Sequence, residues 1–211
     1  EAMTGGVALA DFDGDGWIDI YFLNGVPLPI DPDASGAPTN RLYRNQGDWT
    51  FRDATRQAGV GDTGYGLGVV VGDYNHDGFP DIYVNNFGPN VMYRNNGDGT
   101  FTDVTDLTGV ADGSKVGAGA VFLDMDGDGD LDLYSANYVQ FSYETNPRRM
   151  IRGFLRAPSP LDFPPTSDTL FRNEGDGTFR DVSDQSGISA HRGTGMGIVC
   201  SDYNNDGRTD V

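Results

Sequence analysis

Four short acidic motifs carry the residues in this chain that are best suited to chemistry. Each follows the pattern Asp-x-Asp/Asn-x-Asp-Gly-x-x-Asp, at residues 11–19, 73–81, 124–132 and 202–210. Side-chain oxygens stand at positions 1, 3, 5 and 9, and a backbone carbonyl is available at position 7. Oxygen ligands at alternating positions, with glycine at position 6 for a sharp turn, are what a hard cation requires.

The number of oxygens favours calcium over magnesium. Four side chains, one carbonyl and either a bidentate carboxylate or a water give about six or seven oxygens, whereas magnesium demands a tight octahedron and keeps its waters. We therefore predict about four Ca²⁺ sites. The predicted ligands are Asp11, Asp13, Asp15, Trp17 and Asp19; Asp73, Asn75, Asp77, Phe79 and Asp81; Asp124, Asp126, Asp128, Asp130 and Asp132; and Asp202, Asn204, Asp206, Arg208 and Asp210.

Solvated turns are the alternative to metal loops, since Asp and Gly are common in turns. Two carboxylates about 4 Å apart repel by roughly 4 kcal/mol at an effective dielectric near 20, so crowded acids indicate a counter-ion. An EF-hand loop would place its last carboxylate at position 12, which falls here on Phe22, Val84 and Ser135. The flanking segments also read as strands, so we predict a calcium-bound β-hairpin.

The composition agrees with this prediction. The chain has 14 Lys+Arg against 32 Asp+Glu and a formal net charge of −18, which argues against nucleic acid and against an anionic membrane surface as partners. No apolar run approaches the 18 or so residues needed to cross a bilayer, so no membrane insertion is expected. The 12 Phe, 10 Tyr and 2 Trp argue against disorder.

Short strands must position the acidic loops. Residues 66–72 form an apolar run bounded by glycine, as expected for a strand buried on both faces, and residues 81–85 return after the loop. Residues 91–94 and 100–104 form a second hairpin around an Asn-Gly-Asp-Gly turn. Four short strands in about 50 residues match one blade of a β-propeller, with an open β-solenoid as the alternative.

The pattern repeats along the chain, which predicts a single all-β domain. We divide residues 1–211 into repeat 1 (1–60), repeat 2 (61–110), repeat 3 (111–188, with an insertion at 141–165) and the start of repeat 4 (189–211). The prediction is a β-propeller fragment of about three and a third four-stranded blades. Because the chain begins and ends within expected strands, we expect it to be a piece of a longer protein.

These residues resemble the FG-GAP/VCBS repeats of the integrin α-subunit propeller, and more closely the cartilage acidic protein-like (ASPIC/UnbV-associated) family. The resemblance lies in the acidic loops, a Leu-Tyr-Arg-Asn-x-Gly-Asp-Gly-Thr-Phe-x-Asp-Val block, and the glycine pairs Gly66/Gly68, Gly117/Gly119 and Gly195/Gly197. It implies a seven- or eight-bladed ring, secreted or surface-displayed (periplasmic in a bacterium), with Ca²⁺ between the first two strands of a blade. Thr4 departs from the first glycine position, and too few blades are present here to close a ring.

Residues present in every repeat are expected to support the fold rather than to bind a ligand. We assign Arg44, Arg94 and Arg172 to contacts that brace loops or join blades. The aromatic residues Tyr43, Tyr93 and Phe171, and likewise Phe51, Phe101 and Phe179, are expected to pack in the core.

A ligand is expected where the repeats differ. The insertion at 141–165 carries the candidate ligand contacts Tyr143, Arg148, Arg149, Arg152 and Arg156 on an otherwise acidic chain. Such a patch suits an acidic protein or a carboxylated glycan. The alternative is that the loop merely covers one end of the propeller, with its arginines paired to nearby acids.

The sequence favours a non-catalytic extracellular binding or adhesion module, stiffened by calcium, and no catalytic residues are assigned. Neighbouring blades or domains of a longer chain are expected partners. One alternative is a propeller-type polysaccharide lyase or dehydratase, in which Arg149 or Arg152 binds a uronate and Tyr143 acts as base. Another is a purely structural propeller that supports a neighbouring domain.

Overall fold

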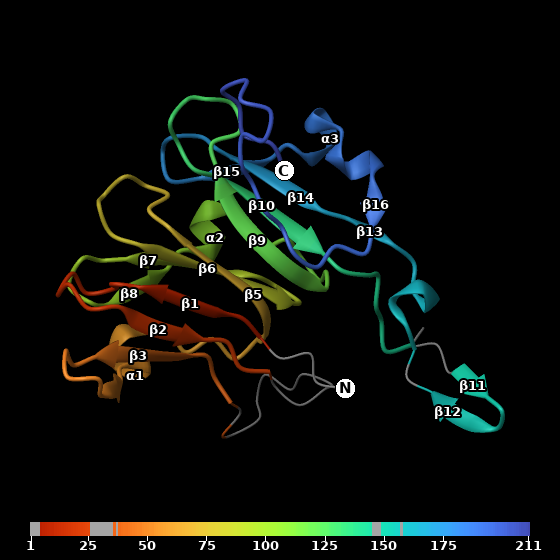
Figure 1. The fold of residues 1–211 in the computed structure, drawn as a ribbon, viewed down its shortest axis with the longest axis horizontal. Coiled ribbons are helices and arrows are strands. Elements are labelled where there is room, and N and C mark those ends of the chain that lie inside the picture. The colour runs from red at the N-terminus through yellow and green to blue at the C-terminus, as the bar shows by residue number, and fades with distance from the viewer. Residues whose placement is uncertain (1–4, 26–35, 37, 145–148, 157) are drawn as a thin grey trace.

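The computed structural model describes residues 5–25, 36, 38–144, 149–156 and 158–211. These residues contain three antiparallel four-stranded sheets, which we call blades 1, 2 and 3 (Figure 1). Blade 1 contains β1 (Val7–Ala10), β2 (Asp19–Phe22), β3 (Arg41–Asn45) and β4 (Phe51–Asp53). Blade 2 contains β5 (Tyr65–Gly72), β6 (Asp81–Phe87), β7 (Val91–Asn95) and β8 (Phe101–Asp103). Blade 3 contains β9 (Gly117–Leu123), β10 (Asp132–Asn137), β14 (Thr169–Asn173) and β15 (Phe179–Asp181).

Short elements follow the fourth strand of each blade or lie in the insertion. One-turn helices α1 (Thr55–Ala58), α2 (Thr105–Thr108) and α3 (Ser183–Ser186) each end at a left-handed glycine. The insertion forms β11 (Arg149–Ile151), β12 (Phe154–Arg156) and the 3-10 turn η1 (Pro160–Asp162); β13 (Thr166–Ser167), η2 (Ile188–Ala190) and β16 (Arg192–Gly193) lie near blade 3. None of the helices in the described part of the chain is long and apolar enough to span a membrane.

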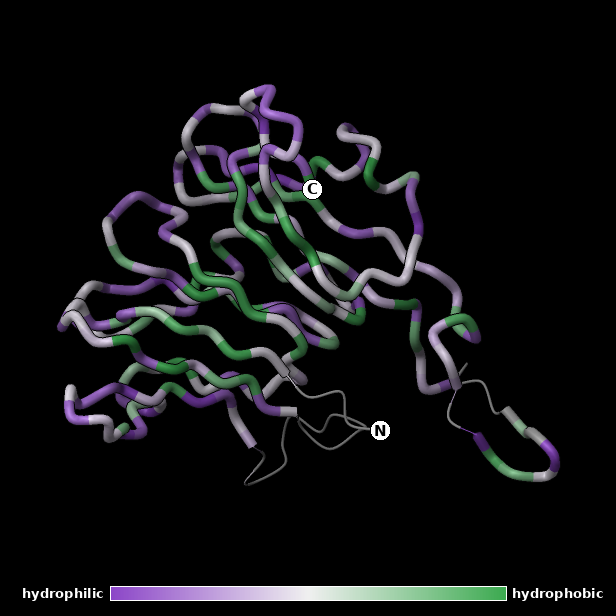
Figure 2. The backbone as a smooth tube through the Cα atoms, viewed as in Figure 1, coloured by the Kyte–Doolittle hydropathy of each residue, from purple (hydrophilic) through white to green (hydrophobic). Residues whose placement is uncertain are grey.

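The three sheets are arranged as propeller blades. Each sheet follows the chain from its first strand to its fourth, with the insertion interrupting only blade 3. The first strand of blade 2, β5, contacts both β1 and β9, so the first strands of successive blades are neighbours. Apolar residues concentrate on the strands, and the connecting loops are hydrophilic (Figure 2). The predicted all-β propeller architecture is confirmed, whereas the number of blades in a closed ring stays a prediction.

Aromatic residues join one blade to the next. Phe101 of blade 2 packs edge-on against Phe12 of blade 1, with ring centroids 5.9 Å apart. Phe179 of blade 3 makes the corresponding contact with Tyr74 of blade 2, at 5.6 Å. The expected core role is therefore confirmed for Phe101 and Phe179. It is wrong for Phe51, which is 43% exposed, because no blade in the described residues covers that face of blade 1.

Two other strand predictions need correction. Residues 69–72 of β5 are only partly buried, because β5 is the edge strand of its sheet rather than a central one. The glycine pair Gly195/Gly197, which the repeat aligns with the strand expected at residues 66–72, does not open a strand: residues 194–200 have no regular structure, and the fourth acidic loop is closed by a single bridge between Ser201 and Asp210. A strand needs partners, and a third strand to complete this hairpin is missing from the described residues.

Replacing Phe101 with alanine tests the packing between blades. Phe101 is 7% exposed, so Phe101→Ala should lower the free energy of unfolding by about 3–5 kcal/mol, as expected for a truncated buried aromatic. Phe51 holds the same repeat position on the open face, so Phe51→Ala should cost about 1 kcal/mol or less. Urea unfolding followed by tryptophan fluorescence measures both. Equal losses would contradict the assigned contact.

Candidate metal centres

The acidic loops connect the first two strands of each blade and share one hydrogen-bonding pattern. The carboxylate at position 1 accepts the N–H of the glycine at position 6, and the carboxylate at position 5 accepts the N–H of position 7. For position 1 the donors and acceptors are Gly16 and Asp11 (2.8 Å), Gly78 and Asp73 (2.8 Å), Gly129 and Asp124 (3.1 Å), and Gly207 and Asp202 (2.8 Å). These bonds curl each loop around its own acidic side chains.

Two positions in every loop have a left-handed backbone. Position 6 is always glycine, as the sequence predicted, with φ between 84° and 96° in the four loops. Position 4 is also left-handed, and there the chain places Gly14, His76, Gly127 and Asn205. Asparagine and histidine both adopt this conformation more often than most other non-glycine residues do.

The position-9 carboxylates tie the loop to the sheet. Asp19, Asp81 and Asp132 are fully buried at the start of the second strand. In each, one oxygen accepts the N–H of loop position 2 and the other accepts the N–H of an asparagine at the end of the third strand. A carboxylate oxygen has a second lone pair, so these bonds leave room for a metal ligand role.

Position 9 is a costly place for a charge without a counter-ion. Burial raises the pKa of the Asp81 carboxyl to about 7, against the lowering effect of its bonds to the Asn95 and Tyr74 N–H groups. Burial also raises the pKa of Asp19 and Asp132. Two neighbouring carboxylates of the same loop raise each of these pKa values further: those at positions 3 and 5 for Asp19 and Asp132, and those at positions 1 and 5 for Asp81. A cation at the loop centre would lower the pKa values again.

In loops 1 and 3 the carboxylates at positions 1, 3 and 5 converge. Oxygens of Asp11, Asp13 and Asp15 lie within 4.8 Å of one another, and those of Asp124, Asp126 and Asp128 do the same. The structure thus brings together three of the five predicted ligands in each of these loops. Their oxygens are close enough together to share one cation.

One oxygen in loop 1 is left without a partner. Oδ1 of Asp13 is buried and, among the described residues, accepts no hydrogen bond. The other oxygen, Oδ2, lies 3.3 Å from Nε of Arg44, whose guanidinium also donates to the carbonyl of Gly99 in blade 2. A buried, unpaired carboxylate oxygen is costly unless something positive meets it, so the residues of loop 1 fit a hard cation.

Loops 2 and 4 have asparagine at position 3 and therefore one fewer charge. Oδ1 of Asn75 accepts the Asp77 N–H at 3.2 Å, and Oδ1 of Asn204 accepts the Asp206 N–H at 2.9 Å. In loop 2 the Asn75 amide also donates to Oδ2 of Asp77 at 2.9 Å. A cation would therefore have one fewer carboxylate to neutralise at positions 1, 3 and 5 of loops 2 and 4 than at those positions of loops 1 and 3.

Position 7 packs its side chain outside the loop. The Trp17 ring lies directly against Gly47, and the Phe79 ring lies against Gly97, so closely that a Cβ on either glycine would clash. The side chain of Asp130 lies near Nε2 of His76, at 3.2 Å. The predicted role of this position as a carbonyl ligand, like that of position 9 as a carboxylate ligand, stays a prediction.

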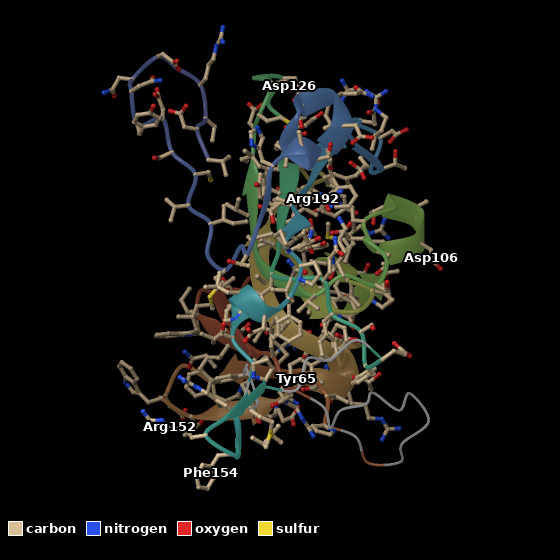
Figure 3. All side chains as sticks on the ribbon, turned by 90° about the vertical axis from the view of Figure 1, so that its right-hand side faces the viewer. Tyr65, Asp106, Asp126, Arg152, Phe154 and Arg192 are labelled. Carbon is tan, nitrogen blue, oxygen red and sulfur yellow. The ribbon has the colours of Figure 1, made fainter. Side chains whose placement is uncertain are left out.

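The residues of the insertion that were predicted to contact a ligand do not lie together. Tyr143 packs in an aromatic cluster, 5.2 Å from Phe141 and 6.2 Å from Phe87 between ring centroids. Arg152 and Phe154 lie on the projecting β11–β12 hairpin, far from Asp126 of loop 3 in Figure 3. The exposed Arg156 and the backbone of Arg149 belong to the same hairpin, whereas Arg148 lies outside the described residues.

The repeated arginines do not behave alike. Arg44 braces loop 1 and reaches blade 2, as expected. Arg172 instead pairs with Glu174 at 2.7 Å, because blade 3 has glutamate where blades 1 and 2 have Gln46 and Asn96. Sequence reasoning also missed Asn95 and Asn173, the buried asparagines that bond to the acidic loops. Their presence in every copy of the repeated block was the available signal.

Comparison with known proteins agrees with this geometry. A family model described as FG-GAP-like repeat matches residues 11–84, 77–135 and 162–211. The chain is 39% identical to human integrin alpha-6 over 80 residues, which are 37% of this chain and 7% of that protein. It is 36% identical to human integrin alpha-7 over 90 residues (40% of the chain, 8% of that protein) and 40% identical to cartilage acidic protein 1 of Xenopus tropicalis over 42 residues (20% and 6%). The matches therefore span less than a tenth of these relatives.

Proposed function

Because the chain belongs to the FG-GAP-like repeat family, we propose that it is a calcium-binding part of an extracellular β-propeller that serves as a binding or adhesion module. The observation that carries the calcium proposal is the buried, unpaired Oδ1 of Asp13 inside a cluster of three converging carboxylates. The adhesion proposal draws on the similarity to two integrins. The repeat boundaries at residues 60, 110 and 188 belong to the same proposal.

The ligands of each ion are proposed to follow the shared loop pattern. Positions 1, 3 and 5 supply side-chain oxygens, position 7 supplies its carbonyl, and position 9 supplies a carboxylate that is also hydrogen-bonded to the sheet. When bound, the ion neutralises the crowded acids and fixes the hairpin. Extracellular fluid contains millimolar calcium, at which even weak sites of this kind fill.

Calcium titration tests the metal proposal. Isothermal titration of a chelator-treated sample should give about four bound Ca²⁺ per chain, and magnesium at the same concentration should not compete effectively because it resists dehydration. Asp13→Ala removes the unpaired oxygen and should remove one ion from the count. A matched control is Asp106→Ala, which removes the same charge from the exposed surface of α2. A wild-type count of zero would refute the proposal.

The β11–β12 hairpin is the proposed contact for an acidic protein or glycan. Arg152 and Arg156 are exposed on it, and arginine pairs well with carboxylates. On immobilised polygalacturonate in calcium, Arg152→Glu and Arg156→Glu should each weaken binding about tenfold, since a charged hydrogen bond contributes about 1.5–3 kcal/mol. Arg52→Glu, an exposed change on β4, should have no effect. Equal binding by all variants would remove the hairpin from the proposal.

The lyase alternative is not favoured by any contact in the described residues. Its proposed base, Tyr143, is engaged with Phe87 and Phe141, and Arg152 lies at the tip of a separate hairpin. The same polygalacturonate incubation also reports on this alternative, because a lyase would generate unsaturated products that absorb in the ultraviolet.

A further inference from the structure

One buried asparagine stands where two acidic loops meet. The side-chain amide of Asn95 donates to the carbonyl of Phe12, at position 2 of loop 1, at 2.9 Å. It also donates to the carbonyl of Pro80, at position 8 of loop 2, at 3.2 Å. The Asn95 backbone N–H donates to Oδ1 of Asp81, at position 9 of loop 2, at 2.7 Å. A single residue thus holds both loops.

The next pair of loops is joined in the same way. The Asn173 amide donates to the carbonyl of Tyr74 in loop 2 at 2.9 Å and to the carbonyl of Leu131 in loop 3 at 3.2 Å. Its backbone N–H donates to Asp132 at 2.8 Å. Asn45 holds the same position in blade 1, where its amide donates to the carbonyl of Ile18 in its own loop.

Further contacts connect the loops to the neighbouring blade. The Arg44 guanidinium lies between Asp13 of loop 1 and the carbonyl of Gly99 in the turn of blade 2. The His76 ring of loop 2 lies 3.1 Å from the carbonyl of Gly129 in loop 3. Loops 1 and 2 are therefore connected through Asn95, and loops 2 and 3 through Asn173 and His76, so a rearrangement of one loop in these pairs must be felt by its neighbour.

We propose that adjacent loops bind calcium cooperatively, with Asn95 and Asn173 as the positioning residues that couple them. This inference rests on the proposed calcium function. An ion in loop 2 fixes Asp81, Asp81 fixes the backbone of Asn95, and the Asn95 amide then holds the Phe12 carbonyl between the first two ligands of loop 1. The second ion finds a loop that is already ordered, so it loses less conformational entropy on binding. By thermodynamic linkage, an ion bound in loop 1 strengthens calcium binding in loop 2 by the same factor.

Terbium luminescence can follow loop 1 alone. Trp17 stands at position 7 of loop 1, and the only other tryptophan, Trp49, is exposed and can be replaced by phenylalanine in every sample. Terbium then serves as the calcium probe, excited through Trp17 at a wavelength that Tyr74 of loop 2 and Tyr203 of loop 4 do not absorb. Asp77→Ala, an exposed change within loop 2, should weaken terbium binding at loop 1 about fivefold or more, the lower end of ordinary coupling. Asp106→Ala, with the same loss of charge on α2, should leave it unchanged.

A double-mutant comparison assigns the coupling to Asn95. In an Asn95→Ala background, Asp77→Ala should no longer change the affinity of loop 1. In an Asn173→Ala background, which loses the equivalent bonds one blade further on, the effect of Asp77→Ala should persist in full. This control separates loss of coupling from general destabilisation.

The outcomes are distinct. If Asp77→Ala leaves loop 1 unchanged in the otherwise wild-type chain, the coupling is refuted, and this holds even if Asn95→Ala does not fold. If the effect survives Asn95→Ala, the role of Asn95 is refuted. If the wild-type chain gives no terbium signal and binds no calcium, the proposed function fails and the coupling with it.

Discussion

Removal of calcium with EGTA is expected to lower the melting temperature of this chain by at least about 10 °C. At a free calcium concentration 100 times the dissociation constant, each bound ion stabilises the folded state by about 2.7 kcal/mol. In a chain of this size a loss of 1 kcal/mol lowers the melting temperature by about 2–4 °C, so the loss of two ions suffices. The physical reason is the repulsion among converging carboxylates, such as those of Asp11, Asp13 and Asp15.

Thermal unfolding followed by circular dichroism measures this effect. Readdition of excess calcium should restore the original melting temperature, and magnesium should restore little of it. Raising the salt concentration in EGTA should recover part of the loss, because salt screens repulsion between exposed charges. A metal-free sample that melts at the same temperature with and without calcium would be incompatible with calcium-stabilised loops.

Asp81→Ala is expected to be the most damaging single substitution among the loop carboxylates, with a loss of about 5 kcal/mol or more. Asp81 is fully buried and accepts the N–H groups of Tyr74 at 3.3 Å and Asn95 at 2.7 Å. Each buried donor left without a partner costs about 1–3 kcal/mol. Loss of the ion in loop 2 adds about 2.7 kcal/mol at saturating calcium.

Urea unfolding in calcium and in EGTA separates these two contributions. In EGTA the difference between Asp81→Ala and the wild type should shrink to the part that comes from the two backbone N–H groups. Asp106→Ala serves as the matched control, since it removes one carboxylate of the same blade from an exposed site, and it should cost no more than about 0.5 kcal/mol. Equal losses for the two variants would show that the buried carboxylate has no special role.

The bonding of position 9 gives the acidic loops a structural role besides the proposed metal binding. A carboxylate at this position supports the loop through two N–H groups, and the third strand of the blade provides one of them. The loop is therefore connected to the sheet by hydrogen bonds as well as by any ion that it binds. A rigid support of this kind is what a binding module needs, because side chains at loop positions then keep a fixed geometry.

The β11–β12 hairpin, in contrast, has no support from the sheet of blade 3. Its described side chains, among them Phe154 and Leu155, are exposed, and its two strands pair only with each other. Two-stranded hairpins are marginally stable alone in water, so its conformation depends on surroundings more than that of the blades does. The proposed glycan contact therefore differs from the metal centres in its physical basis as well as in its location.

The sequence by itself determined the blade architecture and the acidic loops that carry the proposed calcium sites. The glycine-bounded apolar runs, the turn residues and the repeated acidic motif each depend on neighbours within a few residues. For that reason the four-stranded blades and the converging carboxylates at positions 1, 3 and 5 of loops 1 and 3 could be predicted from local pattern alone.

The tertiary structure decided everything that depends on which blade faces which. Phe51 and Phe101 stand at equivalent positions of the repeat, yet only Phe101 is buried, because burial requires a ring from the preceding blade. Asn95 likewise joins two loops, although its partner Phe12 lies 83 residues away in the sequence. No local pattern contains such a contact. Contacts between blades arise from the way whole sheets stack, so repetition could mark these residues as important but could not say what they touch.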